Sequence, residues 1–296
     1  MTLYEQILEL FPLGSYEEDR AKNGHLSFEE ETDVRKLAEG VTYRKRLYRR
    51  GDGRNVWVYL AEVAPDAKAE IAVSACPLKT IKPVTVHAAD FEGDVLFAMN
   101  ASFFHFFNNG DKTPYGIQVV RGVTLAEPGR DKAQYSTFFF AVTKDGQPIL
   151  TDADSYYAHW KGKLRYAVGG GLMLIKDREI CFHQNEECHP RTAVGITEDD
   201  RVIFMCCDGR SEKSAGMSYG DMIELYLSLG YPIRDMLCLD GGGSTTVVLK
   251  EADGSFAVNN EPSGPPSPDW GSMGSGPAAN MRPVADAILI INNEIT

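Results

Sequence analysis

Polar side chains that could act on a substrate stand at one end of each of four apolar, strand-like stretches of this 296-residue chain. The stretch CLDGGGSTTVVL, at 238–249, has one aspartate, three glycines and three hydroxyl side chains between its apolar ends. Arginine binds phosphate through paired hydrogen bonds, and carboxylates act as acid, base or nucleophile at an anomeric carbon. The polar residues at the four strand ends therefore suit the binding of a sugar phosphate. They are Asn100, Arg191, Asp208, Arg210 and Asp240.

The glycine triplet 241–243 does not match a nucleotide-binding loop. A P-loop has a lysine after its glycines, and a dinucleotide-binding loop has a third glycine and opens a helix. Here Thr246 stands at that third position, and β-branched residues that favour a strand follow it. Two alternatives stay open. One is a bend in which Asp240 bonds the loop's own amides, and the other is an anion-binding hollow of glycine amides to which Ser244 and Thr245 add donors.

The motifs along the chain resemble the phosphodiester glycosidase family. In order they read NASFF, YGIQVVRG, GGGLMLIKD, HPRTAVGI, DGR followed by SAGMS, LDGGGSTTVV and RPVADAILI, and the resemblance runs from Val41 to Ile295. It implies a single α+β domain. It also implies hydrolysis of a sugar-1-phosphodiester, such as an N-acetylglucosamine-1-phosphodiester, at the glycosidic bond, which releases the sugar and a phosphomonoester.

The resemblance also implies a set of site residues. Asp240 and Asp208 are the catalytic candidates, and we expect Arg191 and Arg210 to hold the phosphodiester. Asp221 stands where the family more often has glutamate, and its shorter side chain fits helix capping better than catalysis. The substrate-binding candidates are Asn100, Phe104, Arg191, Arg210, Gly241, Gly242, Gly243, Ser244, Thr245 and Arg282.

Two features near these residues have more than one interpretation. Four phenylalanines follow Asn100 and could stack on a sugar face, although at least two of them are expected in the core. These are Phe103, Phe104, Phe106 and Phe107. The scheme requires no metal or other cofactor, but a divalent cation held by Asp208 and Asp240 is the competing role for the two carboxylates.

Two rival functions remain open at this point. A metal-dependent phosphodiesterase would use the same carboxylates to break the P–O bond instead of the C–O bond. A non-catalytic glycan-binding protein could use the same scaffold without chemistry. The sequence leaves the sugar, the aglycone, the stereochemical outcome and the oligomeric state open.

The elements that must position these residues are mostly strands. Alternation and apolar runs predict strands at 55–63 and 94–100, two strand–turn–strand units at 136–150 and 193–209, and a last strand at 284–291. Ser218 and Asp221 form a capping box for one helix, which Gly230 ends. This pattern predicts an α+β fold, a single domain of mixed or mainly antiparallel sheet with a few packed helices.

The domain is expected to span residues 41–296. Before it, residues 1–40 are expected to form a short amphipathic helix and a loose entry segment. A Pro/Gly/Ser-rich loop at 261–280 is the one long irregular insert.

The composition of the chain disfavours some classes of binding partner. A net charge of -12 disfavours nucleic acid and anionic membranes, and no apolar run approaches the ~20 residues of a membrane span. The N-terminus lacks the basic start of a signal peptide, so a cytoplasmic protein with reduced cysteines is expected. The stretch CFHQNEECH lacks the paired cysteine spacing of a zinc site. The expected partner is a small-molecule or polymer-linked sugar phosphate.

Overall fold

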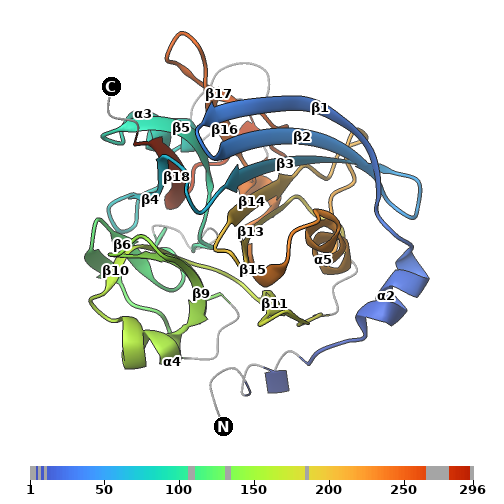
Figure 1. Cartoon of the computed structure of the whole chain (residues 1–296), viewed down its shortest axis with the longest axis horizontal. Helices are drawn as coiled ribbons and strands as arrows, with labels where there is room; N and C mark the ends of the chain where they lie inside the picture. Colours follow the sequence, from blue (N-terminus) through green and yellow to red (C-terminus); the bar gives the residue numbers. More distant parts are fainter. Residues whose placement is uncertain are drawn as a thin grey trace.

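Antiparallel sheets form the framework of the computed structural model (Figure 1). The structure describes residues 12–105, 111–130, 135–183, 187–264 and 280–293, together with Glu5, Leu8 and Glu9. An eight-stranded sheet has the order β1-β2-β3-β14-β13-β15-β11-β12. Its strands are β1 (Ser27–Ala38), β2 (Val41–Arg49), β3 (Asn55–Val63), β11 (Met173–Lys176), β12 (Glu179–Ile180), β13 (Arg191–Thr197), β14 (Val202–Cys207) and β15 (Ile233–Leu239).

Two five-stranded sheets pack with it. The first has the order β17-β16-β5-β18-β4 and consists of β4 (Ala69–Ala75), β5 (Asp94–Asn100), β16 (Val247–Lys250), β17 (Phe256–Val258) and β18 (Asp286–Asn292). The second has the order β7-β6-β10-β8-β9 and consists of β6 (Gln118–Val120), β7 (Val123–Ala126), β8 (Phe138–Thr143), β9 (Pro148–Asp152) and β10 (Leu164–Gly169). One large apolar cluster extends through the sheets, and a smaller one lies beneath β8 and β10.

Few helices accompany the sheets, as predicted, and the α+β fold is confirmed. In the part of the chain that the structure describes they are α2 (Tyr16–Asn23), α3 (Val84–Ala89), α4 (Ala153–Ser155), the π-helical turn η1 (Tyr156–Trp160), α5 (Tyr219–Ser228) and the 3-10 turn η2 (Gly242–Ser244). None of the helices in the described residues has the length and apolar character needed to cross a membrane.

Helix α5 forms where its capping signals predict it. The Ser218 hydroxyl accepts from the Asp221 amide, and the Asp221 carboxylate accepts from the Ser218 amide, which completes the capping box. A Cβ at Gly195 in β13 would lie 2.4 Å from the ring of Tyr226, so the glycine lets α5 approach the eight-stranded sheet. The Tyr226 hydroxyl then donates to the carbonyl of Ile203 in β14 at 2.9 Å.

The N-terminal segment differs from the expected loose entry. Residues 16–38 form α2 and the long edge strand β1, which pairs with β2 across position 40. Strand β1 is largely exposed, so it lacks the apolar alternation by which a strand is recognised in a sequence. Cross-strand ion pairs from Glu31 to Arg44 and Arg46 support it instead. The predicted helix before residue 12 lies almost wholly outside the described residues.

The glycine loop, residues 240–246, connects two different sheets. It leaves β15 of the eight-stranded sheet and enters β16 of a five-stranded sheet, next to the end of β5. The strand-to-strand connection predicted from the sequence is therefore correct, with the short turn η2 inside it. This loop lies where the polar strand ends meet.

Candidate functional site

Backbone hydrogen bonds gather the polar strand ends at the glycine loop. The Asp240 amide donates to the Ala101 carbonyl at 3.0 Å, just after β5, and the Gly242 amide donates to the Pro190 carbonyl at 2.8 Å, just before β13. Arg210, which follows β14, lies against the loop, because a Cβ at Gly242 would be 3.2 Å from its Nη1 atom. The ends of β5, β13, β14 and β15 thus meet at one place.

Two buried asparagines hold the glycine loop: Asn100 bonds both of its ends, and Asn260 bonds its C-terminal end. Asn100 donates from Nδ2 to the Asp240 carbonyl at 2.6 Å and accepts the Thr246 amide at 3.1 Å. Asn260 donates from Nδ2 to the Thr245 carbonyl at 3.1 Å and accepts the Val247 amide at 2.8 Å. Asn100 has no exposed surface, so it supports the loop from within. This placement differs from the substrate-binding role that the sequence predicts for it.

The guanidinium group of Arg191 binds backbone carbonyls inside the protein. Its Nε and Nη2 atoms donate to the carbonyls of Met217 and Glu187, both at 3.0 Å, and its guanidinium lies 4.6 Å from the ring centroid of Tyr219. Only 8% of the residue is exposed. This placement differs from the role of phosphate ligand expected for Arg191, because the guanidinium already binds backbone oxygens.

Arg210 and Arg282 flank the glycine loop instead. A Cβ at Gly243 would clash with Nη2 of Arg282 at 2.5 Å, and one at Gly242 would make a tight contact with Nη1 of Arg210 at 3.2 Å. The missing side chains of these glycines let the guanidinium groups lie close to the backbone. Arg210 adopts a φ of 61°, a left-handed conformation that non-glycine residues rarely adopt and that clusters at functional sites. Burial lowers the pKa of Arg282, and Arg210 adds to this decrease while Asp240 opposes it.

Asp240 is a half-buried carboxyl that interacts with the charge of Arg282. Burial raises its pKa to about 7, against the opposing effects of Ser244, Arg282 and the Gly241 amide. The buried carboxyl of Asp286, which accepts the Ser102 amide at 2.8 Å, raises the pKa of Asp240 further. Asp240 is therefore poised to exchange a proton near neutral pH.

Asp208 has a different environment, although it is the second predicted carboxylate. It is 3% exposed, and its oxygens accept from the Tyr59 hydroxyl at 2.6 Å, from Asn260 Nδ2 at 2.9 Å and from the Glu261 amide at 3.1 Å. Because Asn260 in turn holds the glycine loop, Asp208 supports the site from behind. Burial raises the pKa of Asp208 to about 6 in spite of these donors.

The raised pKa of Asp208 predicts a pH-dependent stability. The folded protein binds this proton more tightly than the unfolded chain, whose aspartate pKa is 3.8. The stabilising contribution is thus complete below pH 4 and is lost as the pH rises through 6, by about 3 kcal/mol in total. Urea unfolding from pH 4 to pH 7 should show this decrease. The Asp208→Asn variant lacks the proton, so an identical slope in that variant would contradict the assignment.

Aromatic side chains form a wall beside the loop. Phe103 is partly exposed and stacks on Tyr135 with ring centroids 4.2 Å apart, and Tyr115 lies 6.2 Å from Tyr135. The negative charge of Asp240 contributes to a raised pKa of Tyr135, after the larger effect of burial. Phe104, by contrast, is 6% exposed and belongs to the core. Phe106 and Phe107 lie outside the described residues.

The sequence interpretation missed Tyr135 and His189. Tyr135 stands alone between polar residues and has no motif around it, so its sequence carries no signal. His189 lies two positions before Arg191 in the HPR motif, and this neighbourhood could have singled it out.

The oxygens of Asp208 do not suit a divalent cation. They already accept hydrogen bonds from a hydroxyl and two N–H groups, whereas a cation site needs free oxygen ligands. No group of three or more His, Cys, Asp or Glu side chains able to hold a metal occurs among the described residues. All six cysteines lie in described positions and are free thiols, five of them buried.

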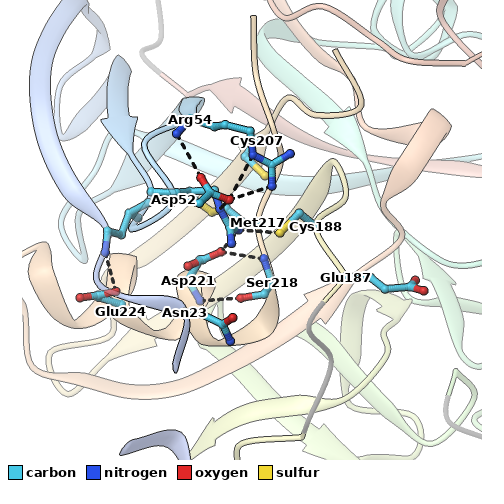
Figure 2. Close-up of polar contacts among 12 residues, drawn as sticks. Asn23, Asp52, Arg54, Glu187, Cys188, Cys207, Met217, Ser218, Asp221 and Glu224 are labelled. Carbon is cyan, nitrogen blue, oxygen red and sulfur yellow. Dashed lines mark hydrogen bonds and ion pairs between the residues drawn. The ribbon is translucent and has the colours of Figure 1, made fainter. Parts of the chain in front are cut away.

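Asp221 belongs to a buried ion-pair cluster at the start of α5 (Figure 2). Besides capping α5, its carboxylate accepts from Arg20 Nη1 at 2.8 Å and pairs with Arg50. Arg20 also binds Glu224 at 3.0 Å, and Arg50 contacts the thiol of Cys188. The cluster thereby ties α2 and the 49–54 turn to the start of α5, and the capping role expected for Asp221 agrees with this placement.

A curated protein of Bacillus subtilis is similar to part of this chain. The chain is 37% identical over 167 residues to the SPbeta prophage-derived uncharacterized protein YomE of Bacillus subtilis (strain 168). This match covers 52% of the chain and 24% of the relative, so the chain spans about a quarter of that protein's length.

Solved structures share the fold. The catalytic domain of zebrafish N-acetylglucosamine-1-phosphodiester alpha-N-acetylglucosaminidase, auto-inhibited by its pro-peptide, superimposes with a TM-score of 0.62. It is 19% identical, over 90% of this chain and 87% of that one. A hypothetical protein from Synechocystis gives a TM-score of 0.55 at 12% identity, over 86% of this chain and 62% of that one.

A family model settles the relationship. The model for phosphodiester glycosidases matches residues 93–291, which is more than half of the chain. The matched segment contains β5, β13, β14 and β15, whose ends meet at the glycine loop. The chain therefore belongs to the phosphodiester glycosidase family.

Proposed function

We propose that this protein hydrolyses a sugar-1-phosphodiester at the bond between the sugar and the phosphate oxygen. The proposal rests on the groups that surround Asp240. A proton-exchanging carboxyl and two guanidinium groups, those of Arg210 and Arg282, share one glycine loop. Guanidinium groups suit a phosphate, and the carboxyl suits the anomeric carbon next to it.

The reaction needs a base more than it needs an acid. Water attacks the anomeric carbon, the C–O bond breaks, and its electron pair leaves with the phosphomonoester. The phosphomonoester is a good leaving group, and Arg210 and Arg282 stabilise its developing charge. Asp240 in its ionised form accepts the proton of the attacking water, for which a pKa of about 7 is well matched.

The substrate is proposed from the family relationship. The zebrafish relative is named for N-acetylglucosamine-1-phosphodiester hydrolysis, and the same class of substrate is our proposal here. The wall of Phe103 and Tyr135 beside Asp240 supports a sugar, because aromatic faces pack against the apolar face of a pyranose.

Hydrolysis in ¹⁸O-water tests the proposal. With the methyl phosphodiester of N-acetylglucosamine-1-phosphate as the probe, we expect monomethyl phosphate without label, as read by ³¹P NMR. Phosphate oxygens do not exchange under these conditions, whereas the anomeric oxygen of the free sugar does, so the phosphate is the product to measure. Label in the phosphate would mean P–O cleavage and would replace the glycosidase by a phosphodiesterase. Binding of the probe without turnover would favour a glycan-binding protein.

A further inference from the structure

His189 stands beside Arg210 at the edge of the glycine loop. Its Nδ1 atom lies 3.4 Å from both Nε and Nη2 of Arg210, a long, forked contact. Its Nε2 atom lies 2.9 Å from Oε2 of Glu187. Since Nδ1 must accept from the guanidinium, the network places the imidazole proton on Nε2, where it donates to the carboxylate.

The backbone of His189 is fixed from several sides. The His189 amide donates to the Met217 carbonyl at 3.3 Å, and the Met217 amide donates to the His189 carbonyl at 3.0 Å. Gly209 and Gly216 make this close approach possible, because a Cβ on either would lie 3.0 Å or less from the His189 backbone. Cys188 directly precedes His189, and its thiol contacts Arg50 of the ion-pair cluster (Figure 2). The imidazole is therefore presented from a rigid segment.

Arg210, in contrast, has little else to orient its side chain. The residue is exposed, and no carboxylate of the described residues lies within ion-pair distance of it. Its guanidinium lies between the His189 ring and the backbone of Gly242. A guanidinium held in place but not neutralised remains available to an external anion.

We propose that His189 is a positioning residue for the substrate phosphate, which it serves by holding the guanidinium of Arg210 over the glycine loop. The inference rests on the proposed function, since it takes Arg210 as a phosphate ligand. Ordering a flexible arginine before the anion arrives removes part of the entropy cost of binding. Glu187 fixes the imidazole orientation, but its contact is exposed and contributes less.

Binding of inorganic phosphate to the full chain tests the role without needing turnover. By isothermal titration calorimetry, we expect Arg210→Ala to raise the Kd by about 30-fold, as loss of a charge-assisted hydrogen bond does. We expect His189→Ala to raise it by about 5-fold, through lost order of Arg210. The double variant should bind no more weakly than Arg210→Ala, because His189 acts only through that arginine.

Two matched substitutions separate positioning from general damage. In His189→Asn the amide oxygen takes the place of Nδ1, so phosphate binding should return to within about 2-fold of the wild type. His189→Gln places its amide near Nε2 and should not restore binding. Urea unfolding of each variant checks that the fold is intact, and binding of free N-acetylglucosamine should not change.

The possible failures are distinguishable. Wild-type phosphate affinity in His189→Ala, or full additivity with Arg210→Ala, would overturn the role of His189 and leave the proposed function standing. Wild-type affinity in Arg210→Ala would remove Arg210 from the phosphate site and overturn the role of His189, whereas label in the phosphate in the ¹⁸O experiment would overturn the proposed function itself.

Discussion

Replacing Asp240 with asparagine is expected to lower kcat for a sugar-1-phosphodiester by about 10³-fold, within the range of a lost general base. Asparagine has the same shape but cannot accept a proton, and the two guanidinium groups remain beside the loop. KM should therefore change little, because the lost interaction belongs to the transition state. The measurement is steady-state release of the phosphomonoester by both proteins.

The same carboxyl predicts an acidic limb in the pH profile. Below its pKa of about 7 Asp240 is protonated and cannot act as a base, so kcat/KM should fall as the pH decreases through 7. The Asp240→Asn variant should lose this limb along with most of its activity.

Controls distinguish chemistry from support. Asp208→Asn should reduce activity less than Asp240→Asn, since Asp208 is buried and acts on the loop through Asn260. Asp253→Asn, in an exposed turn, should have no effect. If Asp240→Asn keeps activity within tenfold of the wild type, Asp240 is not the base. A loss in Asp208→Asn as large as that expected for Asp240→Asn would reassign the catalytic role.

Removing the carboxylate at the centre of the buried ion-pair cluster should have the largest effect on stability. We expect Asp221→Ala to reduce the free energy of unfolding by about 3–5 kcal/mol, because it leaves Arg20 and Arg50 buried with fewer partners. The arginine side chains are 2% and 6% exposed, so water cannot replace the lost carboxylate. The capping box of α5 is lost as well. Urea unfolding at constant pH measures the difference.

An exposed ion pair provides the matched control for this loss. Glu92 pairs with Arg121 at 2.9 Å, but its side chain is 87% exposed, so Glu92→Ala should cost less than about 1 kcal/mol. A cost for Asp221→Ala as small as that of Glu92→Ala would show that the cluster does not stabilise the fold.

Local patterns in the sequence were enough to predict the strands at 55–63 and 94–100 and the helix that Ser218 caps. Alternation, apolar runs and capping boxes depend on neighbouring residues, so they can be read along the chain. The order of motifs was likewise enough to predict the family, which the match over residues 93–291 confirms. Strand β1 was missed because its support comes from ion pairs with β2 and not from an apolar face.

Only the tertiary structure decided which arginines and carboxylates face the glycine loop. Arg191 and Arg210 both follow or begin apolar strands, yet one binds backbone carbonyls and the other lies on Gly242. Asp208 and Asp240 also have similar positions after apolar strands in the sequence. Their environments differ in the structure because Asn260 and Tyr59 donate hydrogen bonds to Asp208. The type of each residue is local information, but its orientation depends on partners tens of residues away, and these meet only when the sheets pack.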